Sequence, residues 1–342
     1  MTTQPLSALK MLLSRHTKRR EFITLLGGAG AAWPLAARAQ QARKIARIGF
    51  LGSTFASPWA SRVEVFRSGL RDLGYVEGEN IAIEFRWAEE KYDQLPRLAA
   101  ELVRLKVDVL VTYGTPGSLV AKRATTTIPI VMVHSGDAVA TGIVASLARP
   151  GGNLTGMTYF LPELTAKRIE MLREVVPHIG QVAIPVKSDN VFFTTALRAV
   201  ETQVKSLNIK LQYFEIRGTN DFAEAFAAMA NRGVDAVVIL EDAIFVSNAR
   251  MIADLAVKQR LPAAGFDEFP QAGGLIGYGV DFPAMYRRAA VFVDKILKGV
   301  KPADIPIEQA TKFVLVINVK TAKALGLEIP QTILIRADEV IE

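Results

Sequence analysis

The sequence predicts an α/β fold built from two parallel β-sheets, and three observations support this class. Short runs rich in β-branched residues alternate along the chain with amphipathic stretches of helical spacing. The strand-like runs are apolar almost throughout, which is typical of parallel sheets covered by helices on both faces. The same order of elements then recurs in the second half of the chain. We therefore expect two lobes that face each other across a hinge, with a ligand cleft where their strands end.

The chain starts with a segment typical of an export signal. Residues 17–40, TKRREFITLLGGAGAAWPLAARAQ, hold the pair Arg19-Arg20, an apolar run at 22–32 and the cleavage pattern Ala37-Arg38-Ala39. Because the pair is followed by Glu-Phe-Ile, we expect a twin-arginine signal over 1–39. Cleavage after Ala39 then leaves a folded protein in the periplasm. The alternative, a transmembrane anchor, needs about 20 apolar residues, and this run is too short.

Charge and composition exclude several classes of function. The 342-residue chain has a formal net charge of +7, but residues 1–39 contribute +5 of it, from six basic residues and one acidic residue. The remaining +2 gives no reason to expect a nucleic-acid surface. The chain has no cysteine, which excludes disulfides, thiol catalysis and thiolate metal sites. About 300 residues remain after cleavage, enough for two domains with cores of their own.

The first half of the exported part reads as four strands joined by three helices. The stretch 57–75 shows the helical signals best, with Pro58 in the first turn, Gly74 at the stop and apolar Val63 and Phe66 at helical spacing. The predicted strands are 44–53, 80–88, 107–114 and 128–137, and the helices are 57–75, 92–106 and 116–126.

The second half repeats this order, and a tail adds further elements. The predicted strands are 179–190, 210–217, 234–242 and 261–268, and the helices are 194–207, 221–233 and 246–260. Val107-Asp108 matches Val234-Asp235 at an offset of 127 residues, and Pro129 matches Pro262 at 133. This nearly constant offset indicates an internal duplication. The tail supplies a strand and loop at 273–281, a helix at 283–299, and a strand followed by a helix at 311–327.

Polar loops follow most of the predicted strands. Gly, Ser and Thr at a strand end that opens a helix offer free N–H groups to a carboxylate or phosphate, although they also serve as ordinary helix caps. The loop at 115–118 is the best candidate for an anion. Acids in such loops could hold a ligand ammonium or only cap a helix; they are Asp137, Asp189, Asp242 and Asp281. Aromatic residues near the loops could sandwich an apolar side chain; they are Phe55, Trp59, Tyr113, Tyr159, Phe160, Phe192, Phe193 and Tyr278.

Catalytic and cofactor motifs are missing from the sequence. It contains no P-loop pattern and no G-x-S-x-G elbow, and the glycines of GGAGAA lie in the signal and follow no strand. The three histidines, His16, His134 and His178, are too scattered for a metal site. His134 is a packing or cleft residue at a strand end, with a catalytic base as the alternative. We therefore expect no cofactor, no metal and no enzymatic activity.

Several long motifs resemble one family of transport proteins. They include GLRDLGYVEGENIAIEFRWAE (69–89), YDQLPRLAAELVRLKVDVLVTYGTP (92–116), GIVASLARPGGNLTGMT (142–158) and KTAKALGLEIPQTILIRADEVIE (320–342). These stretches, and the RREFITLLGG of the signal, resemble the ABC-transporter substrate-binding proteins of the tryptophan/tyrosine type. The resemblance covers the whole chain. It implies a type I periplasmic binding-protein fold, with two Rossmann-like lobes joined by three hinge crossings.

The resemblance also implies lobe boundaries and ligand contacts. Lobe 1 would hold 44–157 and 272–305, and lobe 2 would hold 158–271 and 306–342. Matching loops to the family's cleft, together with Tyr113, gives the expected ligand-binding residues Ser53, Thr54, Tyr113, Thr115, Ser135, Gly136, Asp137, Asn190, Asp242 and Asp281. One departure is the reading Lys-Ser-Asp-Asn at 187–190, where relatives tend to have an Asn-Pro-rich loop. Because of this departure, we expect the lobe 2 side of the pocket to prefer a different ligand from that of the relatives.

The leading interpretation is a periplasmic protein that captures a small molecule by cleft closure and delivers it to an ABC permease. The ligand would be an amino acid, possibly aromatic, or a small carboxylate, and the protein would act as a monomer. One alternative is a ligand-sensing subunit for a membrane kinase or receptor. Another is an enzyme on a Rossmann-like scaffold, which the missing motifs disfavour. A repressor with this pair of lobes would need a DNA-binding helix pair where this chain has its signal.

Overall fold

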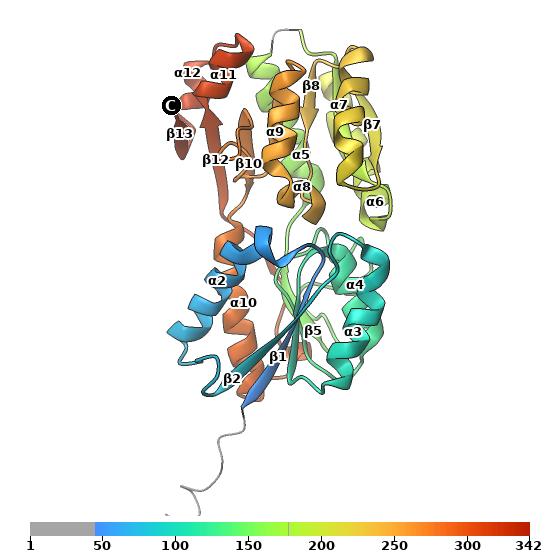
Figure 1. Ribbon diagram of the computed structural model, residues 1–342, viewed down its shortest axis with the longest axis vertical. Coiled ribbons are helices and arrows are strands. Elements are labelled where there is room, and N and C mark those ends of the chain that lie inside the picture. The colour runs from blue at the N-terminus through green and yellow to red at the C-terminus, as the bar shows by residue number, and fades with distance from the viewer. Residues whose placement is uncertain (1–44, 177) are drawn as a thin grey trace, which may run out of the picture. The chain divides into compact units, whose positions relative to one another are not determined.

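The computed structural model describes residues 45–342 apart from residue 177. The expected signal peptide, residues 1–39, lies outside the described residues. Residues 46–342 form one unit with two sheets, shown in Figure 1. The predicted α/β class is confirmed.

The first sheet belongs to lobe 1, and its neighbouring strands are all parallel. In spatial order its strands are β11 (Glu308–Gln309), β5 (Leu154–Thr158), β4 (Ile130–Met132), β3 (Val109–Thr112), β1 (Ala46–Gly52) and β2 (Ile81–Trp87). Its helices are α2 (Ala56–Asp72), α3 (Leu95–Arg104), α4 (Gly114–Ala124) and α10 (Phe282–Leu297).

The second sheet belongs to lobe 2 and is parallel except between β10 and β12. In spatial order its strands are β13 (Glu339–Ile341), β12 (Phe313–Asn318), β10 (Ile276–Val280), β9 (Ala263–Gly265), β8 (Ala236–Val238), β6 (Gln181–Lys187) and β7 (Lys210–Ile216). Its helices are α5 (Leu161–Val175), α6 (Val191–Val204), α7 (Phe222–Asn231), α8 (Ala243–Ser247), α9 (Ala249–Lys258), α11 (Val319–Leu325) and α12 (Gln331–Leu334).

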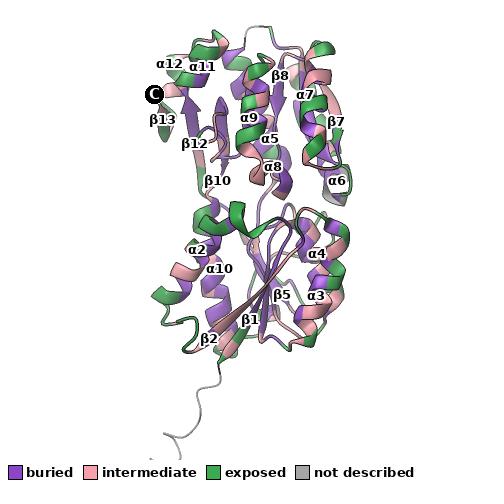
Figure 2. Ribbon diagram, in the orientation of Figure 1, coloured by how far each residue is buried: buried purple, intermediate pink, exposed green. Residues whose placement is uncertain are grey.

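Both faces of the first sheet are covered, as the apolar strands predict (Figure 2). Phe50 of β1 packs with Phe66 of α2 and Tyr286 of α10 on one face. Its neighbour Leu51 points to the other face, where Leu102 of α3 lies, because successive strand residues face opposite sides. All five side chains are fully buried, and truncating a buried Phe to Ala costs about 3–5 kcal/mol.

The two halves repeat each other in detail. In both sheets the strands follow the order second, first, third, fourth, fifth along the chain. Asp108 accepts a hydrogen bond from the backbone N–H of Arg47 at 2.8 Å, and Asp235 accepts one from Gln181 at 2.8 Å. The backbone C=O groups of Pro129 and Pro262 also accept equivalent strand bonds. These matching contacts support the predicted duplication.

The chain crosses between the lobes three times, after β5, after β10 and after β11. Two strand placements differ from the prediction. We expected 272–281 in lobe 1, but β10 pairs with β9 and β12 in lobe 2. We expected 306–342 in lobe 2, but β11 pairs with β5 in lobe 1. The reason is the repeat: β5 and β10 are each the fifth strand of their half, and the crossing follows that strand.

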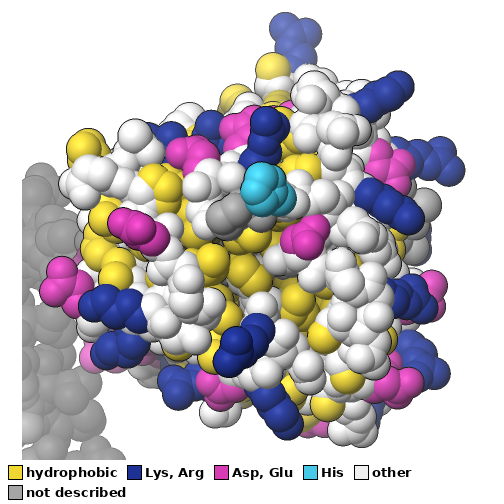
Figure 3. Space-filling model, turned by 90° about the horizontal axis from the view of Figure 1, so that it is seen from above, with side chains coloured by type: hydrophobic (Ala, Val, Ile, Leu, Met, Phe, Trp, Pro, Cys, Tyr) yellow, Lys and Arg dark blue, Asp and Glu magenta, His cyan; other side chains and the backbone are white. Residues whose placement is uncertain are grey.

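Charges of both signs are interspersed on the face seen in Figure 3, where hydrophobic side chains are exposed between them. None of the helices within the described residues has the length and apolarity of a membrane crossing.

Candidate functional site

A small cavity of about 30 Å³ lies between the two lobes. A single water molecule takes up about 10–15 Å³ of such a cavity, so there is room for two or three water molecules. Ligand pockets usually measure about 300–1,000 Å³, so a larger solute needs the lobes to separate or side chains to move. Lobe 1 contributes Trp59, Arg62, Tyr113, Gly114, His134 and Phe282, and lobe 2 contributes Glu241, Asp242, Ala243 and Val246.

Aromatic side chains form the lobe 1 wall of the cavity. Trp59 of α2 stacks on Tyr113, which follows β3, with ring centroids 4.6 Å apart and planes 13° apart. The indole N–H of Trp59 donates to the Tyr286 hydroxyl at 2.6 Å, which fixes the ring. His134, two residues after β4, lies 4.8 Å from Phe282 between ring centroids. These contacts place flat apolar faces around the cavity, which suits an aromatic or apolar group.

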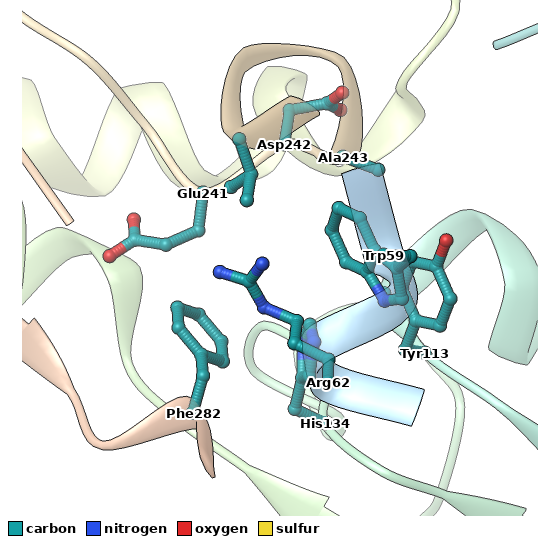
Figure 4. A pocket seen from close by; sticks show the side chains of 10 residues that line it. Trp59, Arg62, Tyr113, His134, Glu241, Asp242, Ala243 and Phe282 are labelled. Atoms are coloured by element: carbon teal, nitrogen blue, oxygen red, sulfur yellow. The ribbon is translucent and has the colours of Figure 1, made fainter. Parts of the chain in front are cut away.

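Arg62 carries its charge into the cavity (Figure 4). Its guanidinium carbon lies 4.7 Å from the Trp59 ring centroid and 5.9 Å from that of Phe282. One nitrogen donates to Glu268, which follows β9 in lobe 2, so this ion pair joins the lobes. The Arg62 side chain is 6% exposed, whereas that of Glu268 is 37% exposed. The pair therefore stands at the edge of the cavity, with its acidic partner closer to solvent.

A second ion pair is fully buried on the lobe 2 side. Arg168 of α5 donates to both carboxylate oxygens of Glu241, and their side chains are 0% and 1% exposed. The same guanidinium donates to the backbone C=O of Tyr278 at 2.8 Å and of Ile239 at 3.2 Å. Arg168 thus ties the end of β8 to β10 and holds Glu241 in place.

Asp242 is a hydrogen-bond hub at the start of α8. Its carboxylate accepts from the hydroxyl of Tyr92 in lobe 1 at 2.7 Å and from the amide of Asn190 at 2.6 Å. It also caps α8 by accepting from the N–H of Ile244 at 3.0 Å. Burial raises the pKa of Asp242, and these donors oppose the rise. Burial, followed by Asp242 itself, raises the pKa of Tyr92 well above its usual value.

Among the described residues, His134 and Asp267 have buried side-chain atoms without hydrogen-bond partners. Both ring nitrogens of His134 are buried and unpaired, and burial followed by the charge of Arg62 lowers its pKa to about 3. The Oδ1 atom of Asp267 is likewise unpaired, and burial followed by the nearby Glu268 raises its pKa to about 7. His134 is therefore neutral at physiological pH, with one ring nitrogen as donor and one as acceptor.

The predicted site residues of lobe 1 form two groups. Ser53 donates its N–H to the Tyr113 hydroxyl at 3.1 Å, and the Thr54 hydroxyl lies 3.2 Å from the same oxygen. These two residues therefore position Tyr113, which lines the cavity. The Thr115 hydroxyl lies 3.2 Å from that of Ser135, which donates to the C=O of Gly136 at 2.8 Å. These three are buried but do not line the cavity.

The remaining predicted residues have mixed positions. Asp242 lines the cavity, and the side-chain amide of Asn190 donates a hydrogen bond to the Asp242 carboxylate. Asp137 accepts from the N–H groups of Val139 and Ala140, and Asp281 caps α10 and pairs with Lys312 at 2.6 Å. Neither Asp137 nor Asp281 lines the cavity. The structure thus brings Tyr113 and Asp242 together and places the other predicted residues behind or beside them.

Sequence reasoning missed the two buried arginines, although their spacing contains a signal. Arg62 falls on the apolar stripe of α2, three residues after Trp59 and four before Phe66. Arg168 falls on the apolar face of α5, four residues before Leu172. A charge on the buried face of a helix needs a buried partner. This signal could have found both. No group of three or more His, Cys, Asp or Glu side chains suited to a metal occurs within the described part of the chain.

Two α/β lobes of this strand order, crossed three times and with a cavity between them, have the fold of type I periplasmic binding proteins. The chain belongs to the ABC transporter substrate binding protein family, whose model matches residues 59–341.

Three relatives illustrate the similarity. The chain is 25% identical over 264 residues to a tyrosine-binding protein of Clostridioides difficile, covering 77% of this chain and 76% of that one. A conserved domain protein of Vibrio cholerae has 25% identity and a TM-score of 0.81, over 87% of this chain and 100% of that one. An ABC domain from Streptococcus pneumoniae, solved in complex with L-Trp, has 24% identity and a TM-score of 0.80, with the same coverage.

Proposed function

We propose that this protein captures a small carboxylate-bearing solute, an amino acid or another small carboxylate, and delivers it to an ABC permease. The observation that carries the proposal is the cavity, because both lobes line it and its wall combines aromatic faces with the Arg62 charge. Membership of the substrate-binding family supports the same function. The relative described as tyrosine-binding supports an aromatic solute.

The mechanism is capture by closure, without chemistry on the solute. A solute that enters the separated lobes contacts Trp59 and Tyr113 on one side and the start of α8 on the other. It favours the closed form by the difference between its affinities for the closed and open forms. The permease then recognises the two lobes in their closed arrangement. We expect the protein to act as a monomer.

The protein reaches its place of action through the twin-arginine signal in residues 1–39. The export proposal rests on the motif around Arg19-Arg20 and on Ala37-Arg38-Ala39. Mass spectrometry of protein from the periplasmic fraction should give a mature N-terminus at Gln40. Replacing Arg19 and Arg20 together by Lys should leave the precursor in the cytoplasm. Periplasmic precursor that still carries residues 1–39 would contradict cleavage after Ala39.

Thermal unfolding of residues 40–342 against amino acids, carboxylates, aromatic acids and nucleosides tests the binding function. A solute at 100 times its Kd should stabilise the protein by about 2.7 kcal/mol. Ala243→Trp, which fills the cavity, should abolish the shift, whereas Ala140→Trp on the exposed surface should keep it. A shift that survives Ala243→Trp would place binding elsewhere.

A further inference from the structure

We propose that the cavity selects aromatic carboxylates that carry no α-ammonium group, and that Arg62 is the contact for the carboxylate. This inference rests on the proposed function and narrows its ligand class. Three features of the cavity carry it: its acids are already engaged, its spare hydrogen-bonding capacity is mainly donor, and its walls are flat and apolar.

The two acidic side chains that line the cavity, within the described residues, already have partners. Glu241 is held by Arg168 through both oxygens, and Asp242 accepts from three separate donors. In Figure 4 both carboxylates point away from the guanidinium of Arg62. A ligand ammonium brings a full charge and three N–H donors, and burying it without acceptors is unfavourable. Asp267 has an unpaired oxygen but does not line the cavity.

The donors at the cavity have capacity to spare. Arg62 has five N–H donors, and the structure gives it one hydrogen-bond partner, the half-exposed Glu268. A planar guanidinium matches a carboxylate with two parallel hydrogen bonds, so a ligand carboxylate competes well with Glu268 for it. His134 adds a neutral imidazole without a partner, beside Phe282. Its N–H can donate to a ligand oxygen without requiring a second charge.

The shape of the walls supplies the aromatic part of the inference. Arg62 lies between the rings of Trp59 and Phe282, at 4.7 and 5.9 Å from their centroids. When the guanidinium turns toward a ligand carboxylate, these two ring faces become available to a flat apolar body. Ala243 and Val246 close the lobe 2 side with small apolar groups. An aromatic ring joined by a short chain to a carboxylate fits this combination of contacts.

Three compounds that share a phenol ring test the inference by isothermal titration of the protein. They are 3-(4-hydroxyphenyl)propionate, L-tyrosine, which adds an ammonium, and tyramine, which has the ammonium but no carboxylate. We expect the propionate to bind at least 10-fold more tightly than tyrosine, and tyramine not to bind. The indole series of indole-3-propionate, L-tryptophan and tryptamine repeats the comparison with a larger ring.

Variants of the Arg62–Glu268 pair test the role of each residue. Arg62→Gln should weaken propionate binding about 10- to 100-fold, the usual range for a lost hydrogen bond to a charged group. Glu268→Gln releases Arg62 and should tighten propionate binding several-fold. The double variant removes both charges, which avoids an unpaired Glu268, and should bind as weakly as Arg62→Gln. Arg71→Gln, an exposed position on the same helix, should leave the affinity unchanged.

The outcomes separate this inference from the proposed function. Tyrosine binding more tightly than the propionate, or Glu268→Gln weakening tyrosine binding, would overturn the ligand class and leave solute capture standing. Binding confined to non-aromatic solutes would also overturn the aromatic ligand class and leave solute capture standing. If no compound in the broad thermal panel binds, the proposed function fails and the ligand class fails with it.

Discussion

Asp267 of lobe 2 and His134 of lobe 1 carry perturbed pKa values, and the two shifts have opposite consequences for stability. The raised pKa of Asp267, about 7, means that the folded state binds a proton that the unfolded state releases above pH 4. This contribution is fully present below about pH 4 and is lost as the pH rises through 7. The lowered pKa of His134, about 3, means that its contribution is present above pH 6.5 and lost as the pH falls.

Asp267→Asn isolates the first of these effects. The variant should be more stable than the original protein at pH 8, by roughly 1–4 kcal/mol, because the buried carboxylate no longer has to ionise. The difference should vanish near pH 3, below the unfolded pKa of about 3.9, where Asp267 is mostly protonated in both states. Urea unfolding between pH 3 and 8 measures it. Asp254→Asn, at an exposed position on α9, should show no such trend, and an equal trend in both variants would contradict the assignment to Asp267.

The buried pair of Arg168 and Glu241 should depend on both partners. Arg168→Leu leaves Glu241 charged and unpaired at 1% exposure, which should cost about 3–5 kcal/mol of unfolding free energy. Replacing both residues by Leu should recover part of this loss. Arg173→Leu, exposed on the same helix, should change stability by less than about 0.5 kcal/mol. Equal stabilities for Arg168→Leu and Arg173→Leu would show that the pair contributes little.

At the level of elements, strand β5 depends on one glycine. Gly156 has φ of +141°, and a Cβ atom there would lie 1.9 Å from the backbone oxygen of Met132 in β4. Both the conformation and the close approach require glycine.

Gly156→Ala should therefore separate β5 from β4 and destabilise lobe 1 by more than about 3 kcal/mol. Chemical denaturation followed by circular dichroism measures this. Gly218→Ala is the control, since its added Cβ meets nothing within 4 Å and its φ is −163°. A loss at Gly156 no larger than that at Gly218 would show that β4 and β5 adjust freely.

The elements with strong periodicity could be predicted from the sequence, whereas those set by distant partners could not. The helix at 57–75 was predicted because Pro58 and Gly74 mark its ends, and the structure gives α2 at 56–72. The sequence patterns predict no element at 154–158 or 161–175, where β5 and α5 lie, because Thr-Gly-Met-Thr has little β signal and two charged residues, Lys167 and Arg168, interrupt the apolar pattern of α5. The lobe of β10 depends on its pairing with β9, which local sequence does not encode.

The residues of the site also fall into those that the sequence predicts and those that depend on distant partners. Tyr113 and Asp242 were predicted because each follows a strand, and strand ends meet at one edge of a parallel sheet. Arg62 and Phe282 lie on α2 and α10, and their meeting depends on the packing of these helices, which are far apart in the sequence. Glu268 reaches Arg62 only across the two lobes.

At the scale of the whole molecule, a few polar contacts join the lobes around the cavity. Besides Arg62 with Glu268, Tyr92 donates to Asp242, and Glu90 accepts from Thr219 at 2.8 Å. Glu90 also accepts from Asn248 at 3.0 Å. Each of these contacts is broken when the lobes separate, so each favours the closed arrangement.

Tyr92→Phe should shift the protein toward the open form. The lost hydrogen bond to a charged group is worth about 1.5–3 kcal/mol, so solute affinity should fall by roughly 10-fold or more. The radius of gyration from small-angle scattering should also rise. Tyr213→Phe removes a similar bond, to Glu201 at 2.8 Å, within lobe 2. It should change neither quantity, and equal effects of the two variants would contradict a role for Tyr92 in closure.

The late position of α10 in the chain affects how the protein is made. The face of lobe 1 that holds Phe50 and Phe66 is completed by α10, which the ribosome makes only after the lobe 2 elements from α5 to β10. At about 5–20 residues per second, this face stays uncovered for roughly 10–30 s of synthesis. A newly made chain therefore exposes an apolar face for that time, and such transiently exposed surface is prone to aggregation. Lobe 1 cannot be folded before residue 297 has left the ribosome, so a pathway that exports folded proteins must wait for almost the entire chain.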